Sequence, residues 1–128
     1  MGSGTQIGRV RGLGASKEGP HHWWHQRLTA GGNLVLMAWL LASIALLPGH
    51  DRTAVVAWLA SPWAAVPMLL LVFSVLYHAR LGLQVVLEDY LHGAWRTAML
   101  VKLNFAVAGA GALALFCILK IAFGGPAA

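Results

Sequence analysis

Three long apolar stretches dominate the pattern of hydrophobic and polar positions along this chain of 128 residues. The first covers about 28–47, contains no charge and stops at Pro48-Gly49, a dipeptide that ends helices and turns the chain. The second covers about 63–87 and the third about 98–123. Since about 20 apolar residues cross the hydrocarbon core of a bilayer as a helix, the sequence predicts an all-α integral membrane protein with three transmembrane spans.

A short apolar piece, 53–60, lies between the first and second spans and is too brief to cross a bilayer. It contains Trp58 and is followed by Trp63. Indole rings favour the headgroup layer, where the N–H group can stay hydrated. We therefore expect this piece to lie in the membrane interface.

The residues before the first span, 1–26, contain Arg9, Arg11 and Lys17 but no continuous apolar core. We therefore expect no cleavable signal peptide and a flexible, basic N-terminal arm that stays in the mature protein. The three-span domain would then cover 27–128. Glycines in the arm follow no predicted strand and lack the spacing of a dinucleotide or P-loop fingerprint, so a phosphate site is not expected there.

Composition excludes most enzyme folds, because 59% of the residues are hydrophobic and only 10% are charged. A small helical unit in lipid has no room for a Rossmann sheet, a barrel or a hydrolase sheet, so any chemistry depends on a few side chains, a bound cofactor or partner chains. The single cysteine, Cys117, excludes a disulfide within the chain and iron–sulfur ligation by this chain alone.

The net charge of +5 reflects membrane topology rather than nucleic-acid binding, because the basic residues are scattered singly. Their number alternates between the successive segments that flank the spans. These residues are Arg9, Arg11, Lys17 and Arg27 before the first span, Arg52 in the first loop, Arg96 and Lys102 in the second loop, and Lys120 near the end. The positive-inside rule predicts that the N-terminus and the loop over 88–99 are cytoplasmic. The loop over 48–62 and the C-terminus would face the other side.

Two ionisable residues, His78 and Arg80, lie well inside the second span. Such groups cost several kcal/mol in hydrocarbon unless they are paired, ligated or hydrated. Arg80 lies ~10 Å of helix rise before the polar end at Glu88, which is a long reach for its side chain. We therefore predict a fixed counter-charge for Arg80.

His78, Gly82, Val85 and Asp89 share one helix face, because eleven residues make close to three turns. A histidine followed one turn later by glycine offers an imidazole nitrogen to a haem iron and space for the ring. This pattern has low specificity, and alone it favours a histidine that hydrogen-bonds a neighbouring helix. The other two spans contain no histidine, so a second axial ligand would come from another chain.

The pair Asp89-Tyr90 at the end of the second span also has two interpretations. Spacing alone favours a helix terminus with an interfacial tyrosine. Alternatively, the phenol donates a hydrogen bond to a quinone carbonyl, and the carboxylate orients the tyrosine and passes on protons.

The stretch from His78 to Gly93 resembles the pattern H-x3-G-x3-V-x2-D-Y-[VIL] of the hydrophobic membrane anchor subunit, the D-type chain, of succinate dehydrogenase (respiratory complex II). A second block, 21–30, is similar to the start of that family's first span, where an arginine precedes a Thr-Ala pair. Three spans with a cytoplasmic N-terminus agree, and the basic arm is similar to those of alphaproteobacterial relatives. The resemblance extends over essentially the whole chain.

The resemblance implies that His78 is one axial ligand of haem b, the other coming from a companion cytochrome b-type subunit. Tyr90 would hydrogen-bond ubiquinone, and Asp89 would support it and the proton route. Arg27 would lie at the haem propionates or the quinone pocket, where His21 assists it.

Arg80 departs from the family pattern, because an aromatic residue is familiar at this position in enteric and mitochondrial relatives. Its expected counter-charge is a haem propionate or a carboxylate of the companion chain.

The resemblance also implies partners that hold the remaining cofactors. FAD would reside in a flavoprotein subunit and the iron–sulfur clusters in an iron–sulfur subunit, where succinate oxidation occurs. This chain would be the non-flavin membrane subunit of succinate:ubiquinone oxidoreductase, tethering those partners to the bacterial cytoplasmic (inner) membrane.

Two alternatives remain at this point. One is a small membrane scaffold, or a transporter component with a proton or ion relay and no cofactor. The other is the anchor of a fumarate reductase.

Overall fold

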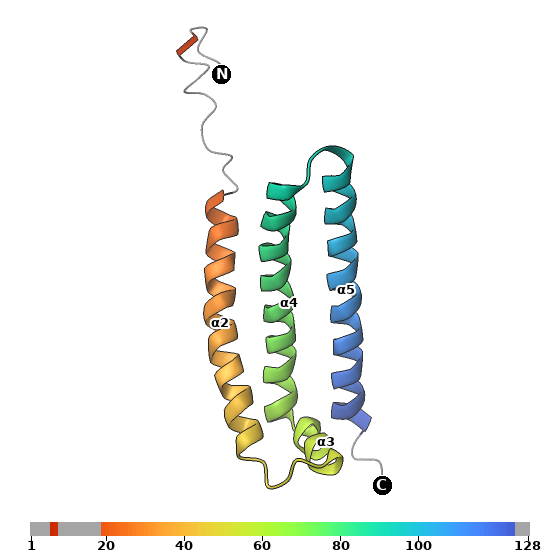
Figure 1. Ribbon diagram of the computed structural model, residues 1–128. Helices are drawn as coiled ribbons and strands as arrows, with labels where there is room; N and C mark the ends of the chain where they lie inside the picture. Colours follow the sequence, from red (N-terminus) through yellow and green to blue (C-terminus); the bar gives the residue numbers. More distant parts are fainter. Residues whose placement is uncertain (1–5, 8–18, 125–128) are drawn as a thin grey trace.

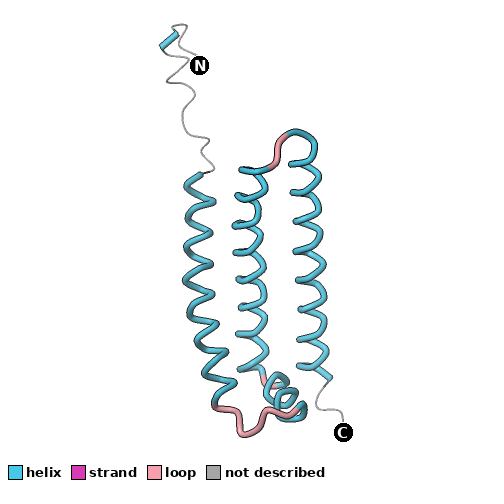
Figure 2. Tube along the Cα trace, viewed as in Figure 1, coloured by secondary structure: helices cyan, strands magenta, loops and turns pink. Residues whose placement is uncertain are grey.

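Three long helices stand side by side in a row in the computed structural model, which describes residues 6–7 and 19–124 (Figure 1). These are α2 (Gly19–Ala45), α4 (Pro62–Tyr90) and α5 (Gly93–Gly124), and the short helix α3 (Arg52–Ala60) lies at one end of the row. The described residues form helices and loops without a strand (Figure 2). The three long helices are apolar enough to span a membrane, which confirms the predicted all-α, three-span architecture.

Helix α4 occupies the centre of the row and packs against both α2 and α5, whereas α2 and α5 make no contact with each other in the described part of the chain. The buried apolar side chains lie mostly on α4: Ala64, Ala65, Leu71 and Leu81, with Ile118 on α5. Most other large apolar side chains are exposed. A single row of helices therefore leaves two broad apolar faces for lipid or for further helices.

Helix α2 begins at Gly19, well before the predicted start of the span near 28, and has Pro20 in its first turn, where proline is tolerated. Hydropathy marks the segment that suits hydrocarbon, and the polar residues 21–27 simply continue the helix beyond it. Residues 19–26 of the expected N-terminal arm are therefore helical. The rest of that arm lies outside the described residues, except for residues 6–7.

The short helix α3 confirms the short element expected over 53–60. Asp51 caps it, because the carboxylate accepts a hydrogen bond from the backbone N–H of Thr53 at 3.2 Å. Trp58 stacks on Trp39 of α2, with ring centroids 5.9 Å apart. Besides this contact with α2, α3 packs against α4 and α5 at this end of the row. The place of α3 in a membrane interface stays a prediction.

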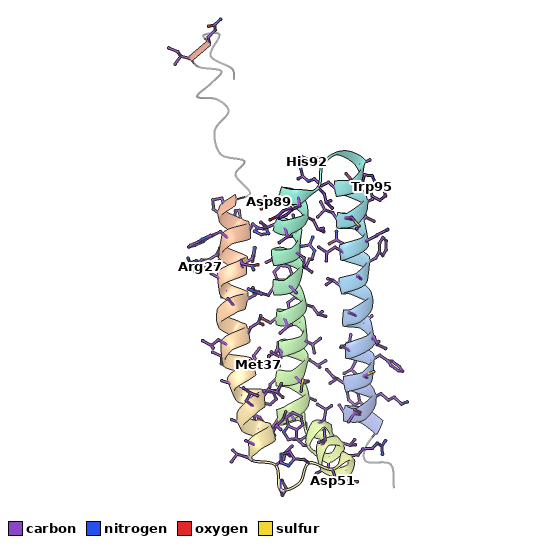
Figure 3. All side chains as sticks on the ribbon, viewed as in Figure 1. Arg27, Met37, Asp51, Asp89, His92 and Trp95 are labelled. Atoms are coloured by element: carbon purple, nitrogen blue, oxygen red, sulfur yellow. The ribbon has the colours of Figure 1, made fainter. Side chains whose placement is uncertain are left out.

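Helices α4 and α5 are joined by a tight turn at the opposite end of the row. Gly93 has φ of 62°, a left-handed conformation that side chains disfavour, and this lets the chain reverse within two residues. As a result Asp89, His92 and Trp95 lie at the same end of the row as Arg27 on α2, far from Asp51 (Figure 3). The charged and aromatic residues that are candidates for a functional site therefore lie at one end of the row.

The up-and-down arrangement predicts that the two ends of the chain lie on opposite sides of the membrane. A periplasm-dependent phosphatase fused after Gly124 or within the loop over 46–51 is expected to be active, and one fused after Leu91 inactive, because the basic flanks favour the cytoplasm. A fluorescent protein that matures only in the cytoplasm should give the inverse pattern. Equal phosphatase activity at Leu91 and Gly124 would contradict this topology.

Candidate functional site

His78 of α4 faces α2, where two polar side chains meet its ring. Its Nδ1 lies 3.0 Å from Oγ1 of Thr29, and its Nε2 lies 3.4 Å from the amide nitrogen of Gln26. These contacts are partly buried. Both ring nitrogens are thus in contact with polar groups of the neighbouring helix, so the hydrogen-bonded histidine expected from spacing alone is present.

Thr29 is anchored to its own helix as well as to α4. Its hydroxyl lies 2.7 Å from the carbonyl oxygen of His25 and 3.1 Å from that of Gln26. The hydroxyl of Ser74, one turn before His78 on α4, donates to the carbonyl oxygen of Thr29 at 3.4 Å. A small polar network therefore joins α2 and α4 at the level of His78.

A cavity of about 1150 Å³ opens between α2 and α4 toward the N-terminal end of α2. Its lining includes several of the site residues expected from the sequence: His21 and Arg27 from α2, with Arg80 and Gly82 from α4. Gln26 also lines it and connects it to His78. The structure therefore brings His21, Arg27 and Arg80 around one space beside His78.

Gly82 is one of the α4 residues that line this cavity. A Cβ atom at this position would lie 3.6 Å from the amide nitrogen of Gln26, the same nitrogen that contacts His78. The missing side chain at Gly82 lets the amide of Gln26 lie close to α4, one turn beyond the imidazole; space for a haem ring there stays a prediction.

Arg80 has a partner that sequence reasoning missed. Its Nε–H donates to Oδ1 of Asn104 on α5 at 2.6 Å. Asn104 is a neutral amide, so the fixed counter-charge expected for Arg80 is not supplied by the described part of this chain. A propionate or a carboxylate from another chain stays a prediction.

Arg27 and His21 are both exposed at the start of α2. The guanidinium of Arg27 lies over the ring of Trp23, 4.4 Å from its centroid. This cation–π contact holds the arginine along its own helix while leaving its N–H groups able to bind an anion.

Asp89 and Tyr90 end α4 and lie outside the cavity lining. Tyr90 is 80% exposed, so its phenol is open to a partner. One residue earlier, Glu88 accepts from Gln84 at 3.1 Å and pairs with Arg96 of α5 at 3.5 Å. The ion pair between Glu88 and Arg96 joins α4 and α5 beside the candidate quinone residues.

The contact between Arg80 and Asn104 yields a test of how α5 is held. A double-mutant cycle of Arg80→Leu and Asn104→Leu should give a coupling energy between about 0.6 and 1.7 kcal/mol, the average and the maximum measured for hydrogen bonds between membrane helices. Unfolding of the assembled protein by SDS in mixed micelles measures it.

Asn33→Leu is the matched control for this cycle. The side-chain oxygen of Asn33 is buried without a hydrogen-bond partner among the described residues, so its replacement should cause no comparable loss. Fully additive effects of the Arg80 and Asn104 substitutions would show that the contact contributes nothing to the fold.

Comparison with known proteins finds a family that matches nearly the whole chain. The family model described as succinate dehydrogenase/fumarate reductase transmembrane subunit matches residues 1–119. No solved structure gives a significant match.

Similar proteins carry the name succinate dehydrogenase hydrophobic membrane anchor subunit. That of Rickettsia bellii is 37% identical over 87 residues, which is 68% of this chain and 70% of the relative. That of Rickettsia conorii is 31% identical over 120 residues, covering 91% and 86% respectively, and that of Paracoccus denitrificans is 28% identical over 92 residues, covering 72% and 71%.

These relatives are bacterial, and the described helices include three of membrane-spanning length. The chain is accordingly a multi-pass protein of a bacterial inner membrane. It belongs to the family of succinate dehydrogenase/fumarate reductase transmembrane subunits, as a membrane anchor subunit of the succinate dehydrogenase kind.

Proposed function

We propose that this chain anchors succinate:ubiquinone oxidoreductase in the membrane, binds haem b together with a companion cytochrome b-type subunit, and forms part of the ubiquinone reduction site. The observation that carries the proposal is His78 beside a cavity whose lining includes Gly82 and three arginines, Arg27, Arg80 and Arg96. The relatives named as succinate dehydrogenase hydrophobic membrane anchor subunits support the anchoring part of this proposal.

The residues around His78 fit a haem group. Gly82 leaves space one turn from the imidazole, and Arg27 and Arg80 offer cationic groups that suit carboxylates such as propionates. Gln26 is a flexible side chain, so its long contact with Nε2 is one that His78 can exchange for iron. A bound haem would supply one-electron transfer, for which two axial ligands are usual in b-type centres.

The protein's own part in this chemistry is to hold the imidazole and to balance charge. Thr29 and the packing of α2 keep the His78 ring in place on α4. Arg80 is held by Asn104 through one nitrogen, which leaves its other N–H groups for an anion. His21 lines the same cavity and adds a further hydrogen-bonding group near its mouth.

Tyr90 and Asp89 supply the quinone part of the proposal. The exposed phenol can donate a hydrogen bond to a quinone carbonyl, and Asp89 can orient the phenol and accept or deliver a proton. Both residues lie at the end of α4 nearest the start of α2, where soluble partners on the cytoplasmic side would bind.

In this assembly the flavoprotein subunit with FAD and the iron–sulfur subunit carry out succinate oxidation and pass electrons to the quinone. The family also includes fumarate reductase anchors. Whether the assembled enzyme oxidises succinate or reduces fumarate depends on those partners and on the quinone rather than on the residues of this chain.

Tyr90→Phe tests the quinone site. Loss of one hydrogen bond worth about 1–3 kcal/mol in the transition state lowers a rate about 5-fold to 160-fold, so succinate-to-quinone turnover should fall at least about fivefold. Succinate oxidation with a soluble dye acceptor should stay near the wild-type rate, because the partners that catalyse it are untouched. Equal loss of both activities would contradict the role of Tyr90.

His78→Ala tests the haem site. The purified complex should lose the b-type band in a reduced-minus-oxidised spectrum, or show it shifted, because the imidazole ligand is gone. His92→Ala is the control, since His92 is an exposed histidine in the turn after α4. A wild-type haem spectrum in His78→Ala would refute the ligand role, and a wild-type complex without any b-type band would favour a scaffold or relay instead.

A further inference from the structure

The hydroxyl of Thr29 lies within hydrogen-bond distance of three groups at the contact between α2 and α4. Its oxygen is 2.7 Å from the carbonyl oxygen of His25, 3.1 Å from that of Gln26 and 3.0 Å from Nδ1 of His78. A hydroxyl has one hydrogen, and carbonyl oxygens have none. Two oxygens 2.7 Å apart need a hydrogen between them, so Thr29 donates to the carbonyl of His25, the back-bonding pattern of threonine in helices.

Nδ1 of His78 must then be the donor in its contact with Thr29. The only hydrogen of the hydroxyl is already used, so its oxygen can meet Nδ1 only as an acceptor. In a neutral imidazole with its hydrogen on Nδ1, the other nitrogen, Nε2, carries a lone pair and no hydrogen.

Gln26 is consistent with this assignment. Its amide nitrogen, which can only donate, lies 3.4 Å from Nε2, while its side-chain oxygen is buried without a partner among the described residues. The tautomer follows from Thr29 alone, whichever way the amide is turned. Nε2 therefore faces the side of the ring where Gln26 and Gly82 line the cavity.

We propose that Thr29 is a positioning residue that fixes His78 in the Nδ1–H tautomer, so that the lone pair of Nε2 is directed at the place where a metal would bind. This inference rests on the proposed function, because it gives the lone pair its role as an iron ligand. The opposite tautomer would carry a hydrogen at Nε2 and could not bind iron until that hydrogen was lost.

The same hydrogen bond affects the electronic properties of the ligand. A partner that accepts from Nδ1–H raises the basicity of the imidazole and fixes its orientation. A more basic axial ligand stabilises ferric iron relative to ferrous iron, so the Thr29 hydroxyl lowers the reduction potential of the haem. Removing the hydroxyl should raise that potential.

Thr29→Val in the complete membrane complex tests this, because valine keeps the branched shape and lacks the hydroxyl. Thr29→Ser keeps the hydroxyl, and Thr53→Val is the matched control on α3, at the far end of the protein. The readouts are haem content, the midpoint potential of haem b by redox titration, and the low-temperature EPR spectrum of the ferric haem, which reports axial-ligand field and orientation.

Thr29→Val should retain haem, show an altered ferric EPR signal and a higher potential. At a fixed solution potential, the ratio of ferric to ferrous haem should fall about threefold to tenfold. A tenfold change corresponds to about 59 mV for one electron. Thr29→Ser and Thr53→Val should match the wild type. If Thr29→Val assembles poorly, Thr29→Ala removes the same hydroxyl with less bulk and should give the same shift.

An unchanged potential and EPR signal in Thr29→Val or Thr29→Ala would overturn the positioning role, and so would Thr29→Ser behaving like Thr29→Val. Neither result would affect the haem assignment, which stands or falls with His78→Ala. Retention of a wild-type haem spectrum in His78→Ala would overturn the proposed haem site, and this inference with it. The two proposals can therefore fail separately.

Discussion

Polar side chains inside the spans must find partners within the protein, and helix α4 meets this constraint on two sides. His78 contacts Thr29 of α2, and Arg80 donates to Asn104 of α5. Residues two apart on a helix point in nearly opposite directions, so these two side chains reach different neighbours. Lipid gives no hydrophobic drive for helices to associate, and hydrogen bonds between helices of about 0.6–2 kcal/mol each therefore matter. These two polar contacts add to the packing of α4 against both neighbours.

The contacts that stabilise the row also shape the candidate site. Thr29 holds the imidazole of His78 while Gly82, one turn later, leaves open space beside it. Arg80 is tied to α5 through only one of its nitrogens and still lines the cavity. The proposed haem site uses this combination of an imidazole beside the cavity, open space and cationic groups. Because packing and site share residues, changes at the site will also affect helix association.

Local sequence patterns were enough to predict the helices and the face of α4 that carries His78 and Gly82. Hydropathy located three spans, and the spacing of His78 and Gly82 placed them on one side of α4 because both depend only on helix geometry. Hydropathy did not locate the start of helix α2, since the polar segment over 21–27 forms helix without being apolar. A polar or amphipathic segment at the start of a helix leaves no hydropathy signal.

The partners of His78 and Arg80 could not be predicted in the same way. Thr29 lies 49 residues from His78, and Asn104 lies 24 residues from Arg80, so these contacts depend on how far each helix is rotated and shifted against its neighbour. Periodicity within one helix does not contain that information. A polar residue within an apolar stretch, such as Asn104, was the one available hint, because it needs a partner in lipid.

The most direct measurement is an electron cryomicroscopy structure of the membrane complex purified through this chain. We expect haem iron bound to Nε2 of His78, with Gln26 turned aside, Nδ1 still within hydrogen-bond distance of Thr29, and a quinone cavity at Tyr90. A His78 ring that contacts only lipid or protein, with no haem against Gly82, would contradict this proposal.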